Sequence, residues 1–141
     1  MNIGDLRTKA EAGSLVAQAI LGACYLEGIG IPVDYGEAFR LLSVAARRGS
    51  ARAAANLGRM YAEGLGREAE PLEAIRFFEI AAEGGEFLAQ IALGRIYSEG
   101  IGVPPDPKVA KRWYSAALTQ CDSVVGCDAE IKQARDFIAR S

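Results

Sequence analysis

The sequence predicts an all-α fold in which helix–turn–helix units stack into an α/α superhelical solenoid. Three observations support this prediction. A stretch of ten residues that begins at Leu21 returns at Leu57 and Leu93, at a constant spacing of 36 residues. Apolar residues within each copy are spaced by three and four, which is typical of a helix face. Each copy ends in Gly-x-Gly, a helix stop. Self-similarity at such a period indicates units that bury their apolar faces only against their neighbours.

The period divides the chain into a single domain over residues 1–141 with five parts. We expect an N-terminal capping helix in 1–12, repeats in 13–48, 49–84 and 85–120, and a loop followed by a C-terminal capping helix in 121–141.

Local signals predict where the helices of the first repeat begin and end. Ser14 precedes an apolar helix pattern and can cap it, and Gly28 can end that helix in a left-handed conformation. Asp34 is the expected N-cap of the second helix, with Glu37 three residues later in a capping-box pattern. The second helix should stop at Gly49.

The other two repeats follow the same plan, and the pattern then breaks. Pro71 stands where the second helix of repeat two should begin, a position that needs no N–H. Asp106-Pro107 gives the same signal in repeat three. After Gln120 the period is lost, and a final amphipathic helix should start at Asp128.

Three glycines are predicted inside helices. Gly22, Gly58 and Gly94 lie one residue after the repeated leucines. A glycine within a helix costs about 1 kcal/mol relative to alanine. Its presence in all three units therefore predicts close approach by a neighbouring helix.

At these residues the chain resembles the Sel1-like repeat (SLR) family, a relative of the tetratricopeptide repeats. The matching residues in the third unit are Ala89, Leu93-Gly94, Tyr97, Gly100, Gly102, Asp106, Ala110, Trp113-Tyr114 and Ala116-Ala117. The resemblance covers Gly13 to Gln120. The chain departs from the family pattern at Gly36 and at residues 67–70. The resemblance implies an adaptor solenoid, often in bacterial signalling or envelope-associated complexes, without implying one ligand.

By analogy with the tetratricopeptide groove, the first helix of each unit should line a concave binding face. The expected lining is Val16, Ala19, Ala23 and Leu26, then Arg52, Ala55, Asn56, Arg59 and Ala62, then Leu88, Ile91, Arg95 and Ser98.

The arginines of this face suggest a peptide partner that carries a carboxylate, because a guanidinium can hold a carboxylate with two hydrogen bonds. The alternative is that Arg59 and Arg95 pair with Glu63 and Glu99, four residues later, as surface ion pairs. Arg52 has no acid at that spacing, so it is the strongest single candidate.

Charge and hydropathy argue against several classes of partner. The chain has 16 basic and 18 acidic residues, a net charge of −2, which gives no general attraction to nucleic acid. The sequence contains no run of 18 apolar residues, so it predicts no membrane span. Residues 1–10 lack the apolar core of a signal peptide, which favours the cytoplasm, although a signal removed earlier would place the chain in the periplasm.

The residue content argues against catalysis, cofactors and metals. Histidine, the commonest general base, is absent. The Gly-x-Gly stretches lack the third glycine and the preceding strand of a nucleotide-binding loop. Three cysteines without histidine make a poor zinc site. Cys121 and Cys127 could form a disulfide in an oxidising compartment, but free thiols are the preferred reading, with Cys24 as a small buried residue.

We therefore expect a non-catalytic protein-interaction module that binds a protein or peptide. One alternative is a structural scaffold whose exposed ends associate, although a monomer is preferred. The other is an accessory subunit of an enzyme or envelope complex.

Overall fold

The structure is a computed structural model that describes residues 2–141. Within this part of the chain there are eight α-helices, one 3₁₀ turn and no β-strand. The elements are α1 (Ile3–Glu11), α2 (Leu15–Glu27), α3 (Tyr35–Arg47), α4 (Ala51–Glu63), α5 (Pro71–Glu83), α6 (Phe87–Glu99), α7 (Pro107–Leu118), η1 (Cys121–Ser123) and α8 (Asp128–Arg140).

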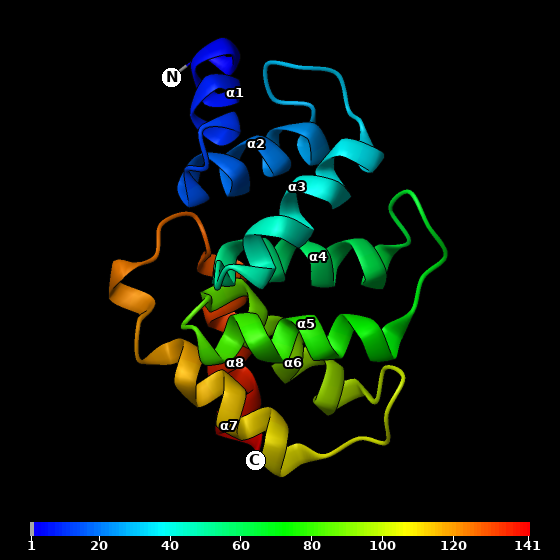
Figure 1. Cartoon of the computed structure of the whole chain (residues 1–141). Coiled ribbons are helices and arrows are strands. Elements are labelled where there is room, and N and C mark those ends of the chain that lie inside the picture. The colour runs from blue at the N-terminus through cyan, green and yellow to red at the C-terminus, as the bar shows by residue number, and fades with distance from the viewer. Residues whose placement is uncertain (1) are drawn as a thin grey trace.

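The helices form antiparallel pairs that stack in chain order from the N-terminus to the C-terminus (Figure 1). The pairs are α2 with α3, α4 with α5, and α6 with α7. The loops that join α4 to α5 and α6 to α7 lie at the right in Figure 1, and the loop that joins α2 to α3 lies at the top. Helix α1 packs on α2, and α8 packs on α7 and α6. The predicted all-α solenoid is confirmed.

The caps form largely as the sequence predicts. The side chains of Ser14, Asp34 and Asp106 each accept a hydrogen bond from a backbone N–H in the first turn of α2, α3 and α7. Only half of the predicted capping box forms, because the Glu37 carboxylate binds the Arg40 guanidinium instead. Helix α1 begins at Ile3, within the segment 1–12 where a capping helix is predicted, and the Asn2 side chain caps it by accepting a hydrogen bond from the Asp5 N–H at 2.8 Å.

The repeated leucines lie in the core. Leu21, Leu57 and Leu93 are each 3% exposed or less. Leu57 packs with residues of α2, α3 and α4, so it joins two successive units. A central leucine in this position contributes about 2–5 kcal/mol through burial and packing.

The helical glycines make room for a large side chain of the next helix. A Cβ added at Gly22 would lie 2.8 Å from Leu42 Cγ, and one added at Gly58 would lie 2.7 Å from Phe78 Cδ1. At Gly94 the nearest atom would be Tyr114 Cε1, at 2.5 Å. The predicted close approach is confirmed, and it is a side chain of the same unit's second helix that makes it.

Candidate functional site

One surface groove is shared by the first helices of all three units. It has a volume of about 470 Å³ and draws residues from α2, α4 and α6. It is called the first-helix groove below, and its lining includes Ala23, Glu27, Arg52, Ala55, Asn56, Arg59, Glu63, Phe78, Glu86, Leu88, Ala92 and Arg95. Leu88 leaves 54% of its surface exposed there, next to charged side chains.

Arg59 lines the groove and bridges two units. Its guanidinium donates to the Glu63 carboxylate at 2.8 Å and also to the Glu27 carboxylate, which comes from the preceding unit. Partial burial lowers the pKa of Arg59, but the hydrogen bonds to Glu27 and Glu63 outweigh it, so the pKa lies above its ordinary value. Arg59 is therefore a fixed cation whose hydrogen-bonding capacity is largely used within the protein.

Arg52 and Arg95 differ from Arg59 in how much hydrogen-bonding capacity they retain. Arg95 Nε is 3.9 Å from the Glu99 carboxylate, too long for a hydrogen bond, and its side chain is 57% exposed. Arg52 is exposed and forms no ion pair within residues 2–141. The alternative prediction was that both arginines pair with the glutamate four residues later. Arg59 forms this pair with a hydrogen bond, whereas Arg95 does not.

Several predicted groove residues face the neighbouring unit instead. Ile91 is 6% exposed and packs with α7 and α8. Ala19 and Leu26 are buried against α4. Their assignment to an open groove is therefore wrong. The reason is geometric: positions 16, 23 and 27 share one helix face, whereas 19 and 26 lie at its edge, where the next first helix, or α8 for Ile91, covers them.

The pattern of the Sel1 repeat family matches residues 15–50, 51–86 and 88–120 of this chain. The chain belongs to the Sel1 repeat family. Each matched range contains one helical pair of the stack, from α2 with α3 to α6 with α7. Sel1 repeat proteins are generally non-catalytic helical scaffolds that take part in protein interactions.

Two solved structures are similar over most of the Sel1 repeat chain. The crystal structure of a Sel1 repeat protein from Oxalobacter formigenes shares 39% identity with a TM-score of 0.77, and the match covers 95% of this chain and 97% of that one. The second is c5321, described as a protective antigen of uropathogenic Escherichia coli strains with an SLR fold. It shares 40% identity over 82% of this chain with a TM-score of 0.77. That match covers only 25% of the Escherichia coli chain. No curated protein matches closely enough to add a relative.

The groove of this Sel1 repeat protein contains acidic and aromatic residues that the sequence did not single out as lining. Glu27, Glu63 and Glu86 line it together with the three arginines, and Phe78 and Ala92 lie among them. The predicted basic centre is therefore a mixed charge pattern, in which three arginines and three glutamates line the same groove. Glutamate recurs at positions 27, 63 and 99, so a repeated acidic position is visible in the sequence. The pairing is not, because Glu27 bonds to Arg59, which lies 32 residues away on another helix.

The remaining candidates lie away from the groove. Cys24 is buried, and Cys121 and Cys127 are free thiols. Burial, followed by the nearby Glu130 and Asp128 carboxylates, raises the pKa of the Cys127 thiol. Within residues 2–141, no three His, Cys, Asp or Glu side chains come together in a way that could hold a metal ion. None of the helices described is both long and apolar enough to cross a bilayer.

Proposed function

We propose that this Sel1 repeat chain is a non-catalytic adaptor that binds a protein or peptide partner in the first-helix groove. The observation that carries the proposal is the mixture of residues available there: Arg52 and Arg95 retain hydrogen-bonding capacity, and Leu88 is exposed in the same groove. Exposed apolar side chains with free cations suit a peptide that carries both apolar and carboxylate groups.

A preformed groove favours this kind of binding. The lining residues sit on α2, α4 and α6, and the Arg59 bridge to Glu27 holds two of these helices in register. A scaffold that is already ordered loses little conformational entropy on association. Fixed charges at the rim also steer the encounter and set its register more than they raise affinity.

Reversing the charge of Arg52 should weaken partner binding without unfolding the chain. We expect Arg52→Glu to reduce affinity on the order of tenfold, mainly through slower association, with a smaller loss at high salt. The measurement is quantitative affinity capture from a lysate of the source organism, followed by binding kinetics with each captured protein at two salt concentrations.

Arg47→Glu is the matched control, since Arg47 is an exposed arginine in the last turn of α3, outside the groove lining. Equal capture by wild type, Arg47→Glu and Arg52→Glu would contradict the proposal. Loss of capture in Arg47→Glu alone would move the partner site to the second helices.

A further inference from the structure

The three junctions between successive units can be compared position by position, because the repeat has a constant length. We define the first seam as the junction of α2 and α3 with α4, the second as that of α4 and α5 with α6, and the third as that of α6 and α7 with α8. Leu26, Ala62 and Ser98 occupy equivalent positions at these seams, 36 residues apart.

At the first seam this position is closed by the chain itself. Leu26 is 4% exposed and belongs to one apolar cluster with Leu42 and Met60, on which Tyr35 and Leu65 also pack. The leucine side chain therefore packs between the two units.

At the second seam the equivalent residues line a hollow instead. Ala62, Pro71, Ala74, Phe78, Ile96 and Ile101 surround a volume of about 400 Å³. Each of the six stands 36 residues after a member of the first-seam cluster, and these members are Leu26, Tyr35, Ala38, Leu42, Met60 and Leu65. The space arises because Ala62 and Pro71 have smaller side chains than their first-seam equivalents, Leu26 and Tyr35. This hollow is called the second-seam socket below.

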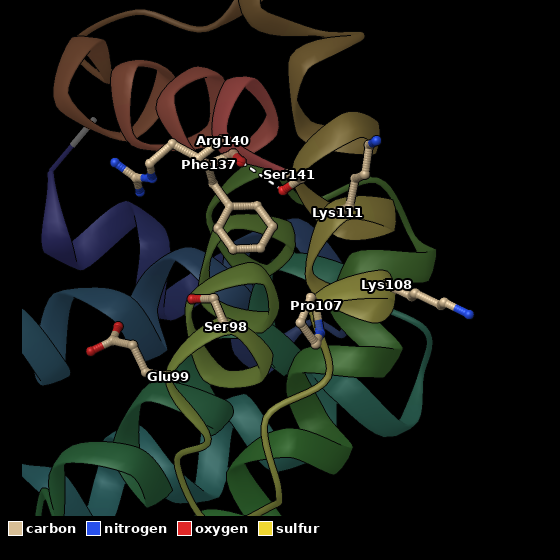
Figure 2. Close-up of a pocket in the computed structure, with 8 residues that line it drawn as sticks. All are labelled: Ser98, Glu99, Pro107, Lys108, Lys111, Phe137, Arg140 and Ser141. Carbon is tan, nitrogen blue, oxygen red and sulfur yellow. Dashed lines mark hydrogen bonds between the residues drawn. The ribbon is translucent and has the colours of Figure 1, made fainter.

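At the third seam an aromatic side chain from outside the repeats reaches the same place. Figure 2 shows the Phe137 ring extending from α8 toward Ser98 and Pro107. The ring centroid lies 5.2 Å from that of Tyr114, which is the third-unit equivalent of Phe78. Leu26 therefore fills this position at the first seam. At the third seam Phe137 lines a hollow of about 580 Å³ together with Ser98 and Pro107, whereas the second-seam socket has no aromatic side chain from outside the repeats in its lining.

The rim of the socket carries a cation with free hydrogen-bonding capacity. Arg59, Glu63, Ala92 and Arg95 complete the lining. Arg59 and Glu63 are paired with each other, whereas Arg95 has no hydrogen bond to Glu99. Arg95 also lines the first-helix groove, so the socket and the groove form one continuous surface around it.

We propose that the second-seam socket binds one large apolar side chain, a leucine or phenylalanine, of a peptide partner whose adjacent aspartate or glutamate pairs with Arg95. This inference rests on the proposed function and specifies it. An apolar anchor that enters a preformed pocket provides most of the binding energy in such interfaces, and the neighbouring charge sets the register. Leu26 shows which kind of side chain fills this position at the first seam, and at the third seam the Phe137 ring lines the equivalent hollow.

The test fills the socket from within by Ala62→Leu, which recreates the arrangement of the first seam. Random dodecapeptides displayed on phage are selected on the wild-type chain. The recovered peptides are measured against wild type and four variants: Ala62→Leu, Arg95→Glu, Arg52→Glu and Ala129→Leu. Ala129 is an exposed alanine of α8 outside the pocket linings, so it controls for added leucine surface. Thermal unfolding of each variant is recorded in parallel.

We expect the selected peptides to share a large apolar residue within a few positions of an acid. Ala62→Leu should weaken them at least about tenfold, Arg95→Glu should weaken them less, and Ala129→Leu should leave them unchanged. The midpoint of unfolding of Ala62→Leu should be equal to or above that of wild type, because the leucine fills a void.

Two results would overturn the inference, and they differ in what they mean for the proposed function. Peptides that bind Ala62→Leu as well as wild type but lose affinity for Arg52→Glu would rule out binding in the socket and still support binding in the first-helix groove. Peptides whose affinity none of these substitutions changes, or no enrichment of any peptide, would rule out binding in the socket and in the first-helix groove.

Discussion

Replacement of Leu57 by alanine is expected to lower the free energy of unfolding by about 2–5 kcal/mol. Leu57 is 1% exposed and packs in the cluster that joins the first unit to the second. Its truncation leaves a cavity at a position where helices from both units hold the surrounding side chains, so collapse into the void is limited. Urea denaturation followed by far-ultraviolet circular dichroism measures the change.

Leu72 provides the matched control for this substitution. It is a leucine of the same unit, in the first turn of α5, but it is 68% exposed. Leu72→Ala should change the free energy of unfolding by about 0.5 kcal/mol or less. Equal effects of the two substitutions would mean that the repeated leucines do not form the core.

Gly94→Ala is expected to destabilise the fold by about 1–3 kcal/mol, even though alanine favours helices over glycine by about 1 kcal/mol. The new Cβ would lie 2.5 Å from Tyr114 Cε1, and that ring is 1% exposed and packed against Phe137. A rigid, enclosed ring cannot move aside without disturbing α8. Thermal and urea unfolding measure the loss.

Gly36→Ala separates this steric effect from helix propensity. Gly36 lies in the first turn of α3, where the nearest atom to an added Cβ is Asp34 Oδ1 at 3.4 Å. This substitution should leave stability unchanged or raise it by up to about 1 kcal/mol. A stabilising effect of Gly94→Ala equal to that of Gly36→Ala would contradict the close packing of Tyr114.

Most of the architecture could be predicted from the sequence because its causes are local or periodic. The constant spacing of Leu21, Leu57 and Leu93 fixes the helical pairs, and the caps at Ser14 and Asp106 depend on residues only three positions away. The glycines inside helices also predicted close packing. Glycine destabilises a helix interior, so its recurrence there indicates that a neighbour approaches too closely for a Cβ.

The binding surface was harder to predict because it depends on how units are rotated against each other. Ile91 has the same place in its repeat as Ala55, yet it is buried because α8, which lies outside the repeats, covers it. The Arg59–Glu27 bridge joins residues of different units. The sequence shows that Ala62 is smaller than Leu26, its equivalent one repeat earlier. It does not show that Phe78, Ile96 and Ile101 surround a hollow beside Ala62.

Nuclear Overhauser contacts between methyl groups of the chain and a peptide selected on it locate the partner site most directly. We predict contacts from the peptide's apolar side chain to the methyl groups of Ala62, Ala92 and Ile101, which line the second-seam socket. Contacts confined to Leu72 and Ile80, exposed on α5, would place the partner on the second helices and contradict binding through the first-helix groove.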